Sequence, residues 1–403
     1  MRRSIAGLVL AATACGVAEG ASDRFVIDST GSGIPRVTSQ APNGWRDSSS
    51  AWRLVPSQVY VGDEGTEGAL VDPQSLAVDD GGRVYVADQK PATIKVFGPD
   101  GRFVRSNGRE GKGPGEFAVA FLGLWKDRLV VHDPRSSRTS VFDTAGAFLT
   151  SWNSACCYWT DIQVDSAGLV YIPSPNFDRS RDDGPRTRNP WVRYDFEGKV
   201  VDTLWVPFRE SDRNWTLSGG SGGNRMMMQL SVPYTPQFNV ALHPSGGFVV
   251  GWGDGYEIAR SPSGLDTTLL IRREWSAPPI PEERRLAAIE QQVAGINRGG
   301  AGQFDEATLR SVFKLADVPS EAPAFETLSV DRDGNVWARQ LLASDSTRTT
   351  WDVFDPRGVW IGPVSVAAPI GKYGAVWYGS GAIYASGEDD LGRPVITRYQ
   401  LDR

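Results

Sequence analysis

The chain has 403 residues, a formal net charge of −6 at pH 7 and an apolar fraction of 40%. Glycine, proline and tryptophan are plentiful, with 45, 26 and 14 residues. This composition is typical of many short strands joined by tight turns around a large core, and it excludes a helical bundle and a disordered chain. Because the charge balance is acidic, the protein has no general attraction for nucleic acid or anionic lipid, and neither is expected as a partner.

The first residues have the pattern of an export signal. Arg2 and Arg3 form a positive start, and an apolar stretch over residues 5–14 ends in small side chains. The stretch is too short to span a bilayer as a helix. The sequence therefore predicts a signal peptide over residues 1–14 and an exported protein, located in the cell envelope or the periplasm.

Cys15 ends the segment 12–15, which resembles the lipobox of bacterial lipoproteins, whose cysteine becomes the lipidated first residue. Position 12 holds alanine where the lipobox usually has a larger aliphatic residue, so ordinary signal cleavage near Ala18 or Ala21 remains the alternative. A lipid on Cys15 would be the expected attachment to the membrane. Residues 15–50 are rich in glycine, serine and proline, which predicts a flexible tether.

A repeated unit decides the expected fold. Residues 75–107 contain four short runs of β-branched and aromatic residues separated by Asp/Gly turns, the pattern of an antiparallel meander. The pattern returns, with losses, five more times, beginning near residues 121, 160, 238, 328 and 374. The sixth copy has three strands and then the chain ends, whereas residues 52–61 form a strand with no blade of its own. This strand can complete the sixth copy and close a ring of six.

The repeat resembles the NHL and related six-bladed β-propeller families, and residues 96–117 are similar to a segment of bacterial exported six-bladed propeller lipoproteins. The resemblance implies an all-β fold over residues 51–403, a six-bladed propeller of four-stranded antiparallel blades that is closed by the N-terminal strand. Its repeated residues are turn and core residues, and propellers include binding modules and enzymes alike. The resemblance therefore implies a fold and leaves the function open.

The long insertions of this propeller are expected on one face, which we call the loop-rich face; the tight first turns of the blades lie on the opposite, plain face. These insertions cover residues 107–120, 152–160, 173–190, 206–237 and 274–325. Long loops commonly carry function, so the loop-rich face is the predicted working face. Within residues 275–325, between blades 4 and 5, apolar residues at helical spacing after Pro281 and a cap at Asp305 predict two helices. They would form a lid over the mouth or merely cover apolar propeller surface.

Two motifs resemble ligand sites without their full patterns. Residues 111–117 are glycine-rich like a phosphate loop, but they lack its GK[ST] ending and no helix pattern follows. Residues 331–335 resemble the start of a calcium loop, but the later glutamate is missing and the segment coincides with the first turn of a blade. Turn chemistry is the better interpretation of both segments.

The remaining reactive residues offer no catalytic constellation. His132 lies at the end of a second strand, where it would point toward the loop-rich face, and His243 lies in a plain-face turn. No nucleophile motif accompanies either histidine, so a Ser/His/Asp site is not expected. Cys156 and Cys157 can form a vicinal disulfide or remain thiols, and their spacing does not predict a zinc site. With Trp159 beside them, they would offer a flat surface for a planar ligand or pack locally.

The sequence thus predicts a ligand- or protein-binding module that acts through its loop-rich face, and we expect a monomer. The candidate contact residues are Arg109, Lys112, Glu116, His132, Arg135, Trp159, Arg179 and Trp252. No catalytic residue or cofactor is identified. The alternative, implied by the lactonase-like six-bladed propellers, is a hydrolase or lyase with a divalent metal in the central channel. A structural module of an envelope complex is a third possibility.

Overall fold

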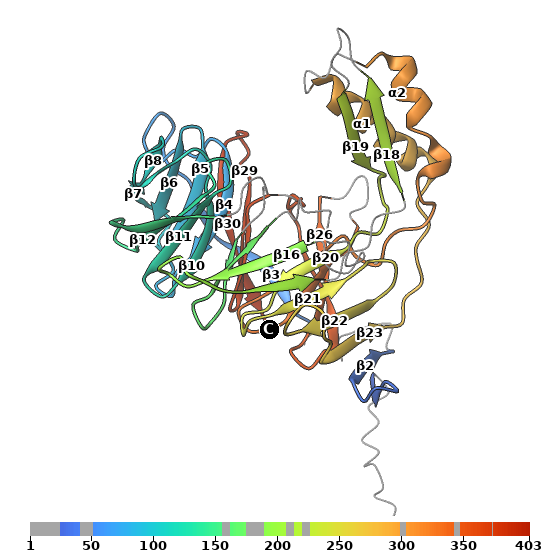
Figure 1. Ribbon diagram of the computed structural model, residues 1–403. Helices are drawn as coiled ribbons and strands as arrows, with labels where there is room; N and C mark the ends of the chain where they lie inside the picture. Colours follow the sequence, from blue (N-terminus) through green and yellow to red (C-terminus); the bar gives the residue numbers. More distant parts are fainter. Residues whose placement is uncertain are drawn as a thin grey trace, which may run out of the picture.

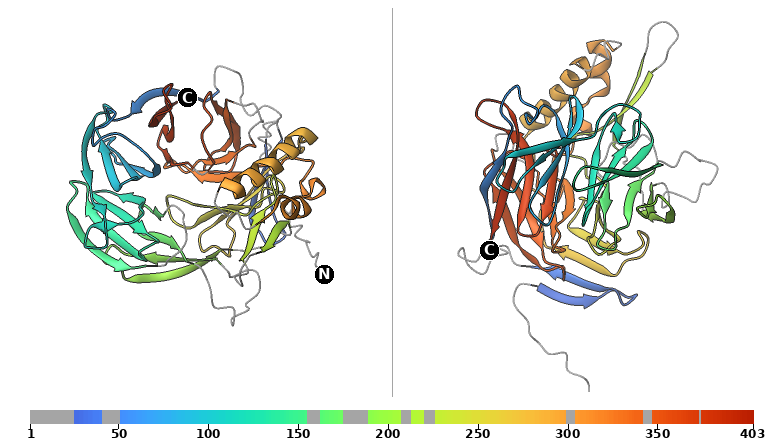
Figure 2. Two further views of the ribbon diagram at one scale, coloured as in Figure 1. Left: turned by 90° about the horizontal axis from the view of Figure 1, so that it is seen from above. Right: turned by 90° about the vertical axis from the view of Figure 1, so that its left-hand side faces the viewer.

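The computed structural model describes residues 25–40, 51–154, 162–174, 189–206, 213–219, 226–298, 304–341, 347–372 and 374–403. Figure 1 shows the resulting disc from the side, and the left view of Figure 2 shows it from above as a ring of blades around a central axis. The described residues form six four-stranded antiparallel blades, so the predicted six-bladed propeller is confirmed.

The first three blades follow one another along the chain. Blade 1 contains β4 (Pro73–Val78), β5 (Val84–Gln89), β6 (Ala92–Phe97) and β7 (Phe103–Asn107). Blade 2 contains β10 (Phe121–Trp125), β11 (Arg128–Asp133), β12 (Arg138–Asp143) and β13 (Phe148–Asn153). Blade 3 contains β14 (Gln163–Val164), β15 (Val170–Pro173), β16 (Asn189–Tyr194) and β17 (Val200–Val206).

The last three blades complete the ring. Blade 4 contains β20 (Asn239–Leu242), β21 (Phe248–Gly251), β22 (Glu257–Ser261) and β23 (Leu269–Arg273). Blade 5 contains β24 (Thr327–Val330), β25 (Val336–Arg339), β26 (Thr349–Phe354) and β27 (Trp360–Val366). Blade 6 contains β28 (Val376–Gly379), β29 (Ala382–Glu388) and β30 (Pro394–Asp402), and its outer strand is β3 (Arg53–Tyr60).

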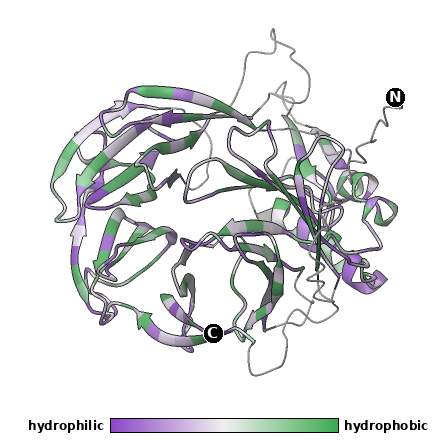
Figure 3. Ribbon diagram, turned by 90° about the horizontal axis from the view of Figure 1, so that it is seen from below, coloured by the Kyte–Doolittle hydropathy of each residue, from purple (hydrophilic) through white to green (hydrophobic). Residues whose placement is uncertain are grey.

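The core of the ring is divided into six apolar clusters, one between each pair of neighbouring blades. The second strand of blade 1 shows how the sequence produces this arrangement. Val84 and Val86 pack against blade 6, whereas Tyr85 and Ala87, on the other side of the strand, pack against blade 2. Both faces of the strand are therefore buried, and the sequence is apolar at successive positions. Figure 3 shows hydrophobic stretches on strands all around the ring.

Ring closure by the N-terminal strand is also confirmed. β3 pairs antiparallel with β30, and Tyr60 lies opposite Ile396. The Tyr60 ring is 1% exposed and lies 6.3 Å from Phe97 of blade 1 and 5.9 Å from Tyr384 of blade 6, measured between ring centroids. The last blade is thus fastened to the first through a strand that lies more than three hundred residues earlier in the chain.

The expected flexible tether over residues 15–50 is wrong for its middle part. β1 (Phe25–Ser29) and β2 (Pro35–Ser39) form a hairpin, and β2 pairs in parallel with β23 of blade 4. Ser39 is buried, and its hydroxyl accepts a hydrogen bond from the backbone N–H of Trp360 in blade 5 at 3.0 Å. These tertiary contacts order a segment whose composition favours flexibility. The hairpin lies at the end of the disc opposite the helices (Figures 1 and 2).

The two largest insertions fold together on the loop-rich face. α1 (Glu282–Arg298), α2 (Glu306–Val312) and a 3₁₀ turn (Leu315–Asp317) lie between blades 4 and 5, where helices were predicted. Asp305 caps α2 by accepting a hydrogen bond from the Thr308 N–H at 2.7 Å, also as predicted. The hairpin β18 (Asn214–Gly219) and β19 (Met226–Ser231), from the insertion before blade 4, packs against these helices. We call this unit the accessory subdomain (Figure 1).

Candidate functional site

On the plain face, a carboxylate in the first turn of each of three blades accepts a hydrogen bond from an aromatic side chain of the strand that follows. Asp79 accepts a hydrogen bond from the Tyr85 hydroxyl at 3.1 Å, and Asp165 accepts one from Tyr171 at 3.0 Å. Asp331 accepts one from the Trp337 indole at 2.9 Å, and burial raises its pKa. The spacing of six residues is the same in all three blades. The supposed calcium loop at residues 331–335 is one of these turns, which agrees with the interpretation as turn chemistry.

On the loop-rich face, Asp88 and Asp133 anchor loops at the ends of second strands. Asp88 is fully buried, accepts hydrogen bonds from the backbone N–H groups of Val71 and Asp72, and pairs with Lys95 at 2.7 Å. Asp133 accepts the N–H of Ala118 at 2.8 Å and two N–H groups of the turn that follows β11. Their carboxylates are therefore occupied by the protein itself.

Three of the candidate contact residues lie together in the loop between blades 1 and 2. Arg109 donates to the Glu116 carboxylate at 2.8 Å, and the Gly113 N–H donates to the same carboxylate at 2.7 Å. The hydrogen bond from Gly113 contributes most, and together with that from Arg109 it lowers the pKa of Glu116. The Lys112 carbonyl accepts a hydrogen bond from Arg138. The loop is thus a folded turn, made of the short pair β8 (Arg109–Glu110) and β9 (Glu116–Phe117), with an exposed Arg109 side chain.

The expectation that His132 contacts a ligand is corrected by its burial. The side chain is 1% exposed, and its Nδ1 lies 3.1 Å from the Thr139 hydroxyl and 3.3 Å from the Ser154 hydroxyl. Removal from water lowers the pKa of His132 to about 4, so the ring is neutral at pH 7. The histidine is an internal residue of blade 2, because the blade buries both faces of β11.

The other candidate contacts do not gather into one cluster within the described residues. Arg135 is exposed in blade 2, and the half-buried Trp252 of blade 4 packs on Phe238 with ring centroids 4.4 Å apart. Trp159, Arg179, Cys156, Cys157 and the proposed lipid attachment residue Cys15 lie outside the described residues.

A charged cluster that sequence reasoning missed lies at the base of the accessory subdomain. Glu326, directly before the inner strand of blade 5, lies 3.7 Å from the guanidinium of Arg339, which is 4% exposed. Arg339 also donates to the Ile370 carbonyl at 2.6 Å. Burial raises the pKa of Glu326, although the positive charges of Lys372, Arg339 and Arg284 oppose this shift. No motif marks these residues, because they come from four separate segments of the chain.

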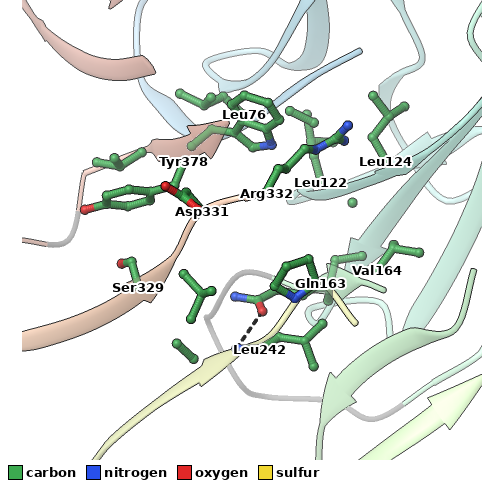
Figure 4. A pocket seen from close by; sticks show the side chains of 18 of the residues that line it. Leu76, Leu122, Leu124, Gln163, Val164, Leu242, Ser329, Asp331, Arg332 and Tyr378 are labelled. Atoms are coloured by element: carbon green, nitrogen blue, oxygen red, sulfur yellow. Dashed lines mark hydrogen bonds between the residues drawn. The ribbon is translucent and has the colours of Figure 1, made fainter. Parts of the chain in front are cut away.

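The central channel contains a cavity of about 250 Å³, and residues from the innermost strands of all six blades line it (Figure 4). The lining residues lie at equivalent levels of the six innermost strands and continue into the turns after them, such as Pro244 and Arg332, so the cavity occupies the plain-face half of the channel. Each innermost strand pairs only with the second strand of its blade, so its other edge faces the channel. Side chains bridge some of these edges: the Leu122 N–H donates to Ser75 and the Leu242 N–H donates to Gln163, both at 3.0 Å.

The described residues do not fit the metal centre of the alternative hypothesis. They contain no group of three or more His, Cys, Asp or Glu side chains that could hold a metal ion. Asp331 is the acidic residue among those that line the cavity, and its oxygens already accept hydrogen bonds from Asn335 and Trp337.

No helix among the described residues is long and apolar enough to cross a membrane.

Comparison with known proteins supports the fold. The NHL repeat matches residues 70–97, which include most of blade 1, and no curated protein matches the chain in sequence. A Bacteroides fragilis protein whose name describes it as exported is 11% identical over 91% of this chain and 100% of its own, with a TM-score of 0.50. A member of the DUF4221 family from Bacteroides vulgatus is 12% identical over 87% of this chain and 99% of its own, with a TM-score of 0.48.

Virginiamycin B lyase from Staphylococcus aureus is 10% identical over 87% of this chain and 99% of its own, with a TM-score of 0.42. At such identities a structural likeness carries no information about function. The sequence match and the architecture nevertheless agree with each other and with the repeat found in the sequence. The chain is a six-bladed β-propeller whose first blade carries an NHL repeat.

Proposed function

We propose that this protein is an exported binding module that recognises a protein partner of the cell envelope through its loop-rich face. The accessory subdomain is the observation that carries the proposal. Two insertions, separated in sequence by the whole of blade 4, fold into one unit with its own apolar core. The ring is closed by β3 and needs no such unit, whereas recognition commonly uses additions mounted on a rigid scaffold.

The surface of the accessory subdomain is suited to contact with another protein. The inner face of the β18–β19 hairpin buries Trp215 and Leu217 against the helices, and the outer face presents Thr216, Gln229 and the 73% exposed side chain of Met227. A flexible, polarisable methionine surrounded by uncharged polar groups is typical of protein-binding surfaces.

Export is the second part of the proposal, and it rests on the charged start and apolar stretch of residues 1–14. A lipid on Cys15 would agree with the arrangement of the folded part. The N-terminal hairpin leaves the disc on the side opposite the accessory subdomain (Figure 1). A chain anchored at its N-terminus would therefore present the loop-rich face away from the membrane.

Site-directed photo-crosslinking in cells that export the full chain tests the proposal. A photoreactive phenylalanine at position 227 should yield a discrete adduct, and unlabelled wild-type protein should compete with its formation. The same group at position 357, in an exposed plain-face turn, serves as the matched control. A Met227→Glu competitor should fail to suppress the adduct. Equal adducts at both positions, or none at position 227, would refute recognition through the accessory subdomain.

A further inference from the structure

The plain-face end of the channel is spanned by a single arginine. Arg332 belongs to the first turn of blade 5, and its guanidinium lies 5.1 Å from the ring centroid of Trp377 in blade 6. The same guanidinium reaches Asp80, in the first turn of blade 1, and donates a hydrogen bond to its carboxylate at 2.9 Å. Figure 4 shows the Arg332 side chain extending from blade 5 among lining residues of other blades.

The ion pair between Arg332 and Asp80 is weak, so another carboxylate can take the place of Asp80. The Asp80 side chain is 84% exposed and that of Arg332 is 37% exposed, so water and salt screen their attraction. Ion pairs of this kind stabilise a protein by about 0–1 kcal/mol. An incoming carboxylate can therefore replace Asp80 at little cost, provided that it gains other contacts inside the channel.

The channel supplies such contacts. The channel-facing edges of the innermost strands place backbone N–H and C=O groups around it, although the N–H groups of Leu122 and Leu242 already donate to side chains. Apolar side chains such as Leu122 and Val164 also line it. A cavity of about 150 Å³ can hold benzene, so this cavity has room for a ligand of roughly ten non-hydrogen atoms. Small-molecule sites commonly combine such concave walls with a few polar groups that fix the orientation of the ligand.

The charges favour a ligand with one negative charge. Among the described residues that line the cavity, Arg332 is the one cationic side chain, and Asp331 beside it is acidic. The whole chain has a formal net charge of −6, which disfavours a phosphate dianion or a polycarboxylate. The planar guanidinium of arginine matches a carboxylate through two parallel hydrogen bonds.

We propose that the plain-face half of the central channel binds a small monocarboxylate, whose carboxylate pairs with Arg332 in place of Asp80. The site lies at the opposite end of the molecule from the accessory subdomain and is independent of the partner proposed for that unit. In the alternative, Arg332 and Asp80 only fasten blades 5 and 1 together. The two alternatives differ in what the loss of Asp80 does, since it removes a competitor in the first and a fastening in the second.

Benzoate and benzamide are suitable probes because they differ little except in charge. Titration calorimetry should show millimolar binding of benzoate and at least tenfold weaker binding of benzamide. Arg332→Gln should abolish this preference, whereas Asp80→Asn should strengthen benzoate binding by up to about fivefold, the equivalent of 1 kcal/mol. Arg357→Gln is the matched control, because Arg357 is an exposed arginine that pairs with Asp355 in another plain-face turn and does not line the cavity.

A measurement on the wild-type chain does not depend on the folding of variants. Benzoate should shift the indole N–H resonance of Trp377 in a ¹⁵N-tryptophan spectrum, since the ring borders Arg332; the resonance is assigned from Trp377→Phe. Equal binding of benzoate and benzamide, an unshifted Trp377 resonance, or a preference that survives Arg332→Gln would overturn the proposal. So would weaker benzoate binding after Asp80→Asn, which is the result expected of a fastening.

Discussion

The ring and the accessory subdomain reach their stability in different ways. In the ring, each blade buries both faces against its neighbours, and six clusters of similar construction share the core. The accessory subdomain has one cluster, in which Leu217 and Leu309 are fully buried and Ile289 lies close by. The ring is therefore cooperative through its closure, whereas the subdomain depends on contacts within itself.

The ring and the accessory subdomain therefore differ in how they tolerate substitution or loss. A repeated contact in the ring has equivalents in other blades, such as the turn carboxylates Asp79, Asp165 and Asp331. The subdomain contacts have no equivalents, and its loss would leave the closed ring intact. A scaffold that does not depend on its addition is suited to carry a recognition element.

The largest loss of unfolding free energy is expected from a substitution where β3 closes the ring. Tyr60→Ala removes a buried ring between blades 6 and 1, and cavities of this kind cost about 3–5 kcal/mol of unfolding free energy. Urea unfolding of both proteins measures the change. Val59→Ala, on the same strand but 44% exposed, is the control and should cost well under half as much. Similar losses for the two variants would show that closure by β3 is unimportant.

A smaller effect on the unfolding free energy is expected from the buried His132 of the ring, and it depends on pH. His132 has a pKa near 4 in the folded protein against an ordinary value of 6.5, so between these values the unfolded chain takes up a proton that the folded chain does not. Stability due to His132 is therefore complete above pH 6.5 and falls as the pH is lowered toward 4, by about 3 kcal/mol in total.

His132→Gln should flatten this part of the dependence of unfolding free energy on pH, measured by urea unfolding between pH 4 and 7. His243 is the internal comparison, because burial and the charge of Arg260 also lower its pKa to about 4. Since His243 is only partly buried, His243→Gln should have a smaller effect. An unchanged pH dependence in His132→Gln would contradict the burial of this ring.

The smallest effect on the ring is expected from a change in the subdomain core. Leu309→Ala removes a fully buried side chain and should cost the subdomain about 2–5 kcal/mol while changing ring unfolding by less than about 0.5 kcal/mol. Hydrogen exchange should show loss of protection in α1 with unchanged protection in β5 and β6. Leu286→Ala, a 45% exposed position on α1, should leave both unchanged. Loss of protection throughout the ring would show that the two regions unfold as one.

Much of the ring could be predicted because its determinants are local and repeated. The alternation around Val84 and Tyr85 specifies a strand buried on both faces, and the turn residues around Asp79 specify where it begins. The missing outer strand of blade 6 then identified residues 52–61 as the closing strand, because a propeller leaves no long edge unpaired.

The sites could be predicted only in part, because side-chain environment depends on neighbours that are distant in sequence. His132 follows a strand pattern that points to the loop-rich face, yet the packing of blade 2 buries it. Arg332 is an ordinary turn residue in the sequence, and only the closed ring brings it to Asp80, 252 positions earlier.

By itself, the sequence determined the repeat, the number of blades, the strand that closes the ring and the face that carries the insertions, since each follows from periodicity and turn chemistry along the chain. The tertiary structure alone decided that residues 25–39 form a hairpin on blade 4, that two insertions build one subdomain, and that a cavity occupies the plain-face half of the channel. The physical reason is that these features depend on contacts between segments whose sequences carry no sign of one another.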